Sequence, residues 1–379
     1  MADERIANGF CAARFEPVRE AFEANFREFN ELGAAVCVYW QGERVVDLWG
    51  GHVDLAKSRA WERDTIVSMA SVFKGMLAFA LHMVADRGLI DYDQPVARYW
   101  PEFAQAGKEN ITVRQAISHH AALHFTDFAE PGDTQRWDKM VAAIARQAPE
   151  WLPGTRGAYH TVSIYYIIGE LIARVTGMPP WTFFRREVSE ALDVDYHIWR
   201  TDAEIARTSE DFDMEYFTEG AKASPEVMAR FYKAWGDPEI YLSGEERAQL
   251  PYQRGAGNAR GVARLFAFAA MDGVLDGKRI LSPRTIDLMT EEQWDAPCAV
   301  WGSRMRMALG LSLNDPDFFY LGPNPDAFGA AGAGGSFGMA DRESRLSIGY
   351  SLNRWWPALS YGERARGLID AVYASLPTA

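Results

Sequence analysis

The chain has 379 residues, 48% of them hydrophobic and 24% charged, which is sufficient for two domains with substantial cores. A formal net charge of −13 without a basic cluster argues against a nucleic-acid partner. Cys11, Cys37 and Cys298 lie far apart without metal-ligand spacing, so we expect neither a disulfide framework nor a bound metal.

The N-terminal stretch MADERIANGF contains no apolar signal segment, and no part of the chain is long and uncharged enough to span a bilayer. These features predict a cytoplasmic protein that binds no membrane. We expect a small-molecule substrate and no cofactor, and a homo-oligomer remains possible.

Apolar periodicity and turn residues predict helices in the middle of the chain and strands at both ends. A first helix is expected over Phe15–Leu32, closed by Gly33, and two strands are expected around a tight turn at Gln41–Gly42. Within 66–87 a helix is predicted to open at SVFK, after the strand-like stretch DTIVSMA, and 111–123 is predicted as a short helix that runs into a loop. Further helices are predicted at 137–148, 163–177, 181–192, 258–273 and 360–376. Short strands are predicted at 307–313, 334–341 and 346–353, and 200–255 is expected to be irregular.

Antiparallel strands from the two termini can pair into one sheet, flanked by the first and last helices. This pattern predicts an α+β fold with a helical lobe. We assign residues 1–74 and 276–379 to a discontinuous sheet domain and residues 75–275 to a mainly helical domain. The active site is expected in the groove between them.

The helix expected within 66–87 opens on the stretch SVFKG, in which Lys74 follows Ser71 by three residues within an apolar segment. On a helix this spacing places both side chains on the same side. Burial lowers the pKa of an amine, so such a lysine can act as a base that activates the serine. The alternative is a capping serine followed by a lysine that extends to solvent. The apolar residues are expected on one broad face: Val72, Phe73, Met76, Leu77, Ala80 and Met83.

Four other stretches follow SVFK along the chain. AISHHAAL resembles a Ser-His-x-x-Gly-Leu loop, and LPGTRGAYHT resembles a Pro-Gly-x-x-x-x-Tyr-x-Asn/Ser segment. NARGVARLFAFAAMDG is similar to a family helix, and FGAAGAGGSFGMAD to a Gly-rich strand. Together they resemble the serine β-lactamase-related superfamily, and within it the class C β-lactamase-like, or family VIII, carboxylesterases. This resemblance implies a β-lactamase/DD-peptidase-like fold.

The resemblance also implies catalytic roles. Ser71 corresponds to the acyl-accepting nucleophile, and Lys74 to the partner that shares or takes its proton. Tyr159 corresponds to the tyrosine whose phenol or phenolate relays a proton to the leaving group. The backbone N–H groups of Ser71 and Ala333 correspond to the oxyanion hole.

Two substrate-binding motifs depart from the family pattern. Thr161 stands where Asn or Ser is usual. Ala330, Ala331 and Gly332 replace Lys-Thr-Gly, or the His-x-Gly and Trp-x-Gly of esterase relatives. The cation that would pair with a substrate carboxylate is therefore missing, although Arg304 or Arg306 could supply a charge from a neighbouring segment.

Other residues offer alternative chemistry. His119, His120 and His124 form a cluster that suits hydrogen bonding better than zinc. Ser163 and Ser336 are rival nucleophiles, and Ser336 lies in a literal Gly-x-Ser-x-Gly. That motif needs a helix after it, whereas a strand is predicted.

The resemblance and the residues together predict a serine hydrolase that cleaves carboxylic esters through an acyl-Ser71 intermediate. The alternatives are a β-lactamase, a D-amino-acid peptidase or an acyltransferase of the same superfamily, and a non-catalytic binding protein.

Overall fold

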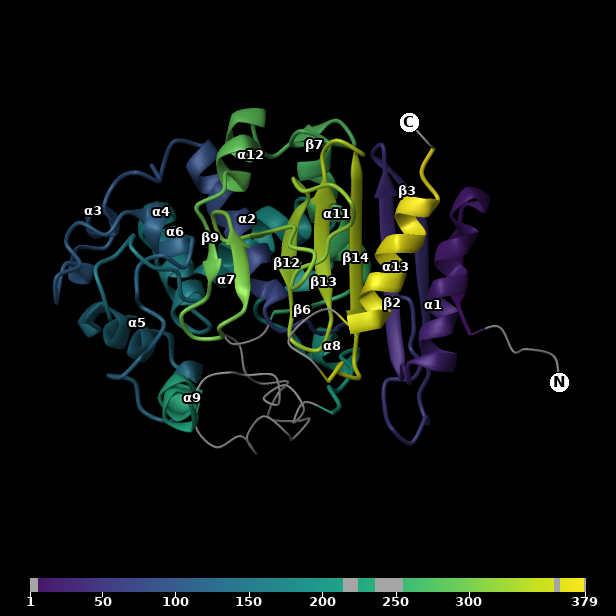
Figure 1. Cartoon of the computed structure of the whole chain (residues 1–379), viewed down its shortest axis with the longest axis horizontal. Coiled ribbons are helices and arrows are strands. Elements are labelled where there is room, and N and C mark those ends of the chain that lie inside the picture. The colour runs from purple at the N-terminus through teal and green to yellow at the C-terminus, as the bar shows by residue number, and fades with distance from the viewer. Residues whose placement is uncertain (1–5, 214–223, 236–254, 358–361, 378–379) are drawn as a thin grey trace.

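The structure is a computed structural model that describes residues 6–213, 224–235, 255–357 and 362–377. Within these ranges the main sheet has nine antiparallel strands in the order β1-β3-β2-β14-β13-β12-β11-β10-β9 (Figure 1). Their bounds are β1 Asn8–Cys11, β2 Gly33–Trp40, β3 Glu43–Gly51, β9 Trp294–Pro297, β10 Arg304–Met307, β11 Ser312–Leu313, β12 Phe328–Ala331, β13 Phe337–Asp341 and β14 Leu346–Leu352. The β2–β14 pairing joins the two ends of the chain, which confirms the predicted α+β fold.

The predicted hairpin is present between β2 and β3. Gln41 and Gly42 have φ values of 53° and 83°, as the two central residues of a type I′ turn require. The predicted strand at 307–313 is wrong, because residues 308–311 turn between β10 and β11.

The helices with more than one turn of regular structure lie at both faces of the sheet and in the lobe. They are α1 Glu16–Glu28, α2 Val72–Asp86, α3 Val96–Tyr99, α4 Val113–Ile117, α5 Trp137–Arg146, α6 Ser163–Thr176, α7 Pro180–Phe184, α8 Asp202–Ala206, α9 Pro225–Tyr232, α11 Ala259–Ala270, α12 Pro283–Thr290 and α13 Gly362–Ala374. Because α8 and α9 fall within 200–255, the prediction of irregular structure is wrong there, and the remainder of that stretch lies outside the described residues.

Alternation along the strands produces two cores. On β2, Val36 and Val38 pack into the cluster that contains residues of α1 and α13, whereas Cys37 and Tyr39 pack into the cluster that contains residues of α2 and α11. Figure 1 shows α1 and α13 side by side in front of the sheet. The first helix ends at Glu28 rather than at Gly33, which instead opens β2, where a Cβ would lie 2.2 Å from the His52 carbonyl oxygen.

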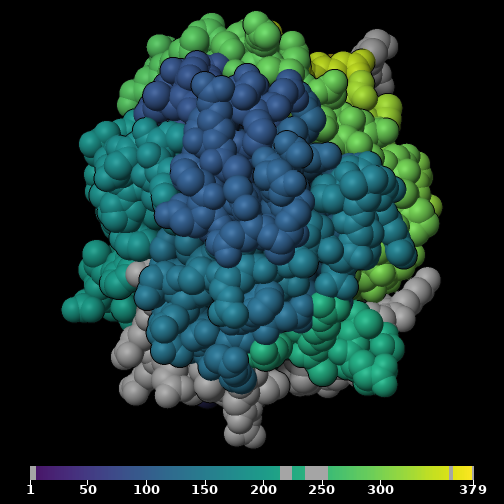
Figure 2. All heavy atoms as spheres, turned by 90° about the vertical axis from the view of Figure 1, so that its left-hand side faces the viewer, coloured from purple at the N-terminus to yellow at the C-terminus, as the bar shows by residue number. Residues whose placement is uncertain are grey.

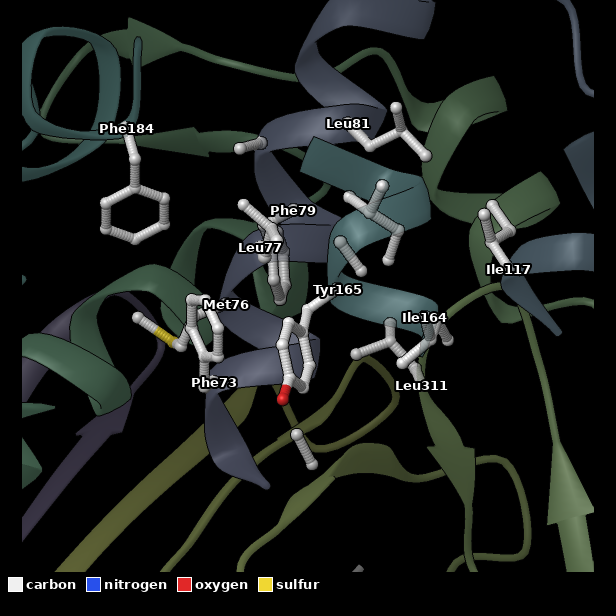
Figure 3. Close-up of a cluster of buried hydrophobic side chains, with 14 of the residues drawn as sticks. Phe73, Met76, Leu77, Phe79, Leu81, Ile117, Ile164, Tyr165, Phe184 and Leu311 are labelled. Carbon is white, nitrogen blue, oxygen red and sulfur yellow. The ribbon is translucent and has the colours of Figure 1, made fainter. Parts of the chain in front are cut away.

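The helix α2 occupies the centre of the molecule between the sheet and the helical lobe. Every residue from Val72 to Val84 is buried, so the prediction of a single apolar face is wrong. Figure 3 shows Phe73, Met76 and Leu77 of this helix among side chains from other elements. A helix that is apolar on all sides packs in a core, and any cation on it is desolvated.

The helical lobe forms one end of the molecule. Figure 2 views that end, where blue and teal segments make up most of the visible face. The helix α11, which we assigned to the helical domain, packs on the sheet: Ser347 Oγ donates to the Ala263 carbonyl over 2.8 Å, and a Cβ on Gly349 would lie 2.2 Å from the Ala259 oxygen. The proposed domain boundaries stay a prediction. Among the described helices, none has the length and apolarity needed to cross a membrane.

Candidate active site

Ser71 stands at the N-cap position of α2, which confirms the prediction that it begins a helix. It follows the short strand β4 (Val67–Ser68) and Ala70, whose φ of +44° is unusual for a residue with a side chain. The Ser71 hydroxyl makes no capping hydrogen bond to the helix, so it is available for other contacts. The helix N-terminus favours negative charge that develops on this oxygen.

Lys74 contacts the serine directly. Its Nζ lies 2.9 Å from Ser71 Oγ, and the residue is 7% exposed. Burial lowers the pKa of the amine from 10.5 to about 7. A substantial fraction of Lys74 is therefore neutral at neutral pH and can accept a proton.

Tyr159 reaches the same serine from the loop that precedes α6. Its phenol lies close enough to Ser71 for this side chain to lower the pKa of Tyr159, and Lys74 Nζ lies 5.2 Å from the centre of its ring. Burial raises the pKa of Tyr159 to about 12, so the phenol form dominates at neutral pH. The structure thus brings together the three residues expected at the catalytic centre.

The turn after β12 closes the site from the sheet side. Gly332 passes so near the serine loop that a Cβ on it would lie 2.2 Å from the Met69 carbonyl oxygen. This close approach brings Ala333 to the loop that carries Ser71. Among the described residues, neither the Ser71 nor the Ala333 backbone N–H donates to a protein acceptor.

The comparisons with known proteins agree with this geometry. A family model described as beta-lactamase matches residues 22–373. The chain belongs to the beta-lactamase family. It is 31% identical over 366 residues to the esterase/beta-lactamase LipL of Mycobacterium tuberculosis, covering 91% of this chain and 82% of that protein.

Two crystal structures are similar to this protein over almost its whole length. One is a family VIII carboxylesterase, with a TM-score of 0.89, 38% identity and coverage of 98% of this chain and 100% of that one. The other is a penicillin-binding protein homolog from Caulobacter crescentus, with a TM-score of 0.91, 36% identity and coverage of 98% and 100%. The protein is therefore a hydrolase of the serine β-lactamase fold.

The third motif of this beta-lactamase-family chain packs against α2. Ala330 is 6% exposed, and a Cβ added to Gly75 would lie 2.4 Å from its Cβ. Ala331 and Gly332 complete the segment. Thr161 is partly exposed, but its Oγ1 is buried and has no hydrogen-bond partner among the described residues.

Neither candidate arginine replaces the missing cation. Arg304 binds the Asp295 carboxylate through contacts of 2.7 and 2.6 Å. Arg306 binds Glu292 at 2.9 Å and also donates to two backbone carbonyls. Carboxylates already neutralise both guanidinium groups, which lie on β10.

The rival nucleophiles hold structural positions. The Ser163 hydroxyl donates to the Leu123 carbonyl and is fully buried. Ser336 is 2% exposed and precedes β13, so no helix follows the Gly-x-Ser-x-Gly stretch. These positions argue against either serine as the nucleophile, and for Ser336 they agree with the strand that sequence analysis predicted after it.

Of the three histidines that sequence analysis treated as hydrogen-bonding groups, His119 acts as an acceptor, whereas His124 Nδ1 is buried with no hydrogen-bond partner among the described residues. His119 Nδ1 accepts from the His160 N–H at 2.8 Å, and His160 Nε2 accepts from the Leu123 N–H at 3.1 Å. Sequence reasoning missed two neighbours of Tyr159. The His119 ring stacks on its ring, and Cys298 Sγ accepts its backbone N–H at 3.3 Å. The histidines of the SHH stretch could have indicated His119 as a neighbour of Tyr159, whereas nothing in the sequence indicated Cys298.

A cavity of about 330 Å³ lies beside the segment that carries Tyr159. Its lining is His124, Phe125, Glu150, Trp151, Glu226, Val227, Arg230, Ala299 and Val300. Hydrogen bonds link two of its walls to the tyrosine segment: Ala299 donates to the Gly157 carbonyl at 3.0 Å, and the Leu123 N–H, next to His124, donates to His160.

Proposed function

We propose that this protein is a serine carboxylesterase that cleaves its substrate through an acyl-Ser71 intermediate. The observation that carries the proposal is the 2.9 Å contact between Ser71 Oγ and a buried amine whose pKa is about 7. A neutral amine at hydrogen-bond distance is a suitable general base for a hydroxyl nucleophile.

In the acylation step, Lys74 takes the Ser71 proton while Oγ forms a bond to the ester carbonyl carbon. The carbonyl oxygen becomes negative and is stabilised by the N–H groups of Ser71 and Ala333. Such donors contribute about 3 to 4 kcal/mol each. When the carbon–alkoxide bond breaks, Tyr159 donates its phenol proton to the leaving oxygen and recovers one from the Lys74 ammonium. The products are a free alcohol and the acyl-enzyme.

Deacylation reverses these roles with water as the nucleophile. Lys74 and Tyr159 remove a proton from the water, which attacks the acyl carbon. The bond to Ser71 Oγ breaks, and this oxygen regains a proton as the carboxylic acid leaves. Because burial raises rather than lowers the pKa of Tyr159, we assign the first proton transfer to the Lys74 amine and not to a phenolate.

The missing cation favours esters over β-lactams. A charged partner for a substrate carboxylate typically contributes about 1.5 to 3 kcal/mol. Ala330 has no charge, and the carboxylates of Asp295 and Glu292 occupy Arg304 and Arg306. The similarity to the family VIII carboxylesterase supports the same choice.

We assign an uncharged apolar arm of the ester to the cavity of about 330 Å³, whose wall at Ala299 is hydrogen-bonded to Gly157 in the segment that carries Tyr159. Phe125, Trp151 and Val300 supply apolar walls. Its one lining cation, Arg230, already binds Asp127 and Glu150, while Glu226 adds a negative charge. A carboxylate would be repelled there, whereas an alkyl or aryl group would be accepted.

The decisive experiment is the ratio of kcat/KM for p-nitrophenyl butyrate to that for nitrocefin on one enzyme preparation. We expect measurable ester hydrolysis, poor or absent nitrocefin turnover, and loss of both in Ser71→Ala. A fluorophosphonate probe should label the wild type and not this variant. Efficient nitrocefin turnover with negligible esterase activity would favour the β-lactamase alternative, and an unlabelled wild type would favour a binding protein.

A further inference from the structure

Among the described residues, the ring of Tyr159 stacks on one other ring, that of His119. The ring centres are 4.5 Å apart and the planes differ by 26°. The backbone of His119 has a φ of +62°, which few residues with a side chain adopt. Such strained conformations cost energy and persist where the surrounding structure holds them. Here the strained residue places an imidazole on the phenol that faces the nucleophile.

Three interactions hold His119 in this place. Its Nδ1 accepts the His160 N–H at 2.8 Å, and its carbonyl oxygen accepts the Ala158 N–H at 3.0 Å. Its ring also lies edge-to-face with the His160 ring, with centres 5.4 Å apart. Because Nδ1 accepts a hydrogen bond, the neutral ring carries its proton on Nε2. Burial and the nearby Lys74 both lower the pKa of His119, which keeps it neutral.

Other contacts already fix the backbone of the tyrosine segment. The Tyr159 N–H donates to Cys298 Sγ, and the Gly157 carbonyl accepts from the Ala299 N–H. These bonds set where the chain runs, but they leave the tyrosine side chain free to rotate about two torsions. The phenol also packs against the hydrophobic cluster that contains residues of α1 and α13 and lies 5.2 Å from Lys74 Nζ, and the stacked imidazole is the ring contact that favours one plane of the phenol.

We propose that His119 is a positioning residue whose ring directs the Tyr159 phenol toward Ser71, so that the leaving alkoxide can be protonated. The inference rests on the proposed esterase function. It concerns the proton donor alone, because the Ser71–Lys74 contact does not involve His119. A ring stack of this kind is worth enough to change the population of the correctly oriented phenol about two- to tenfold.

The test compares two leaving groups, ethanol and p-nitrophenol, with butyrate as the common acyl group. Ethoxide is a poor leaving group that needs the proton from Tyr159, whereas p-nitrophenolate leaves without one. We would measure kcat and KM for ethyl butyrate and p-nitrophenyl butyrate in the wild type, His119→Asn and His119→Phe, together with the melting temperature. Asn retains an acceptor for the His160 N–H and tolerates positive φ, but it lacks the ring. Phe retains the ring and lacks the acceptor.

We expect His119→Asn to lower kcat/KM for ethyl butyrate about two- to tenfold more than kcat/KM for p-nitrophenyl butyrate. The ratio kcat/KM reports acylation, the step in which the leaving group departs, whereas the later deacylation step is the same for both substrates. His119→Phe should keep the wild-type ratio of the two kcat/KM values and lose thermal stability, since the His160 N–H is left unpaired. An unchanged ratio in His119→Asn, or an equal loss on both substrates, would overturn the inference. If His119→Phe does not fold, the Asn variant decides alone. Absence of Ser71-dependent hydrolysis in the wild type would instead refute the proposed function.

Discussion

Replacing Lys74 by Met should stabilise the protein while abolishing its turnover. Met is uncharged and flexible and has a similar length, so it can occupy the same space in the core. Burial lowers the Lys74 pKa from 10.5 to about 7, which corresponds to a cost of roughly 4 to 5 kcal/mol for holding the protonated form in the folded state. The hydrogen bond that its Nζ makes with Ser71 offsets a small part of this cost.

The lowered pKa of Lys74 also predicts how the free energy of unfolding changes with pH. Between pH 7 and 10.5 the unfolded chain binds a proton at Lys74 that the folded chain has lost, so wild-type stability gains from rising pH over this window. The Met variant lacks this titration. Its advantage in free energy of unfolding should therefore be largest below pH 7 and should shrink by roughly 2 kcal/mol from pH 7 to pH 9.

Urea unfolding followed by tryptophan fluorescence at pH 6, 7, 8 and 9 would measure the difference. The matched control is Lys108→Met. Lys108 is fully buried too, but its Nζ donates to three carbonyls, those of Gln105, Ala145 and Gln147. Its loss should destabilise the protein. A stability gap for Lys74→Met that is the same at pH 7 and pH 9 would refute a depressed Lys74 pKa. In the wild type, kcat/KM for p-nitrophenyl butyrate should rise with pH around an apparent pKa near 7.

Three further substitutions test the geometry of the site. Gly332→Ala should lower kcat/KM about 100-fold, because its Cβ would lie 2.2 Å from the Met69 carbonyl oxygen and displace an oxyanion donor. The control is Gly367→Ala, where a Cβ would have open space around it; this variant should leave kcat/KM unchanged and keep or raise the stability of the fold. Val300→Trp should fill the cavity and reduce kcat/KM for hexanoate or octanoate esters more than for acetate, by about fourfold for each methylene excluded. If kcat/KM depends on acyl chain length as in the wild type, the cavity is not part of the substrate site. Ala330→Lys should lower the melting temperature without raising nitrocefin turnover, since the side chain would meet α2 at Gly75, and efficient nitrocefin hydrolysis by this variant would contradict the packing argument.

Several features of the protein follow from local sequence. The type I′ turn depends on two adjacent residues, Gln41 and Gly42, and the Ser71–Lys74 contact depends on a three-residue spacing within one helix. Such short-range rules also placed most of the helices. The termination of the first helix was mispredicted because Gly33, which suits a helix end, is required instead where β2 passes close to His52.

The reactivity of the site was decided by tertiary structure. The spacing of Ser71 and Lys74 predicts contact, but only burial of α2 on all sides lowers the amine pKa to about 7. The motif resemblance identified Tyr159, whereas its raised pKa and its stack on His119 depend on segments distant in sequence. Helical spacing is a property of a few consecutive residues, but desolvation is a property of everything packed around them. The sequence therefore determined which groups could react, and the fold decided their protonation states and orientation.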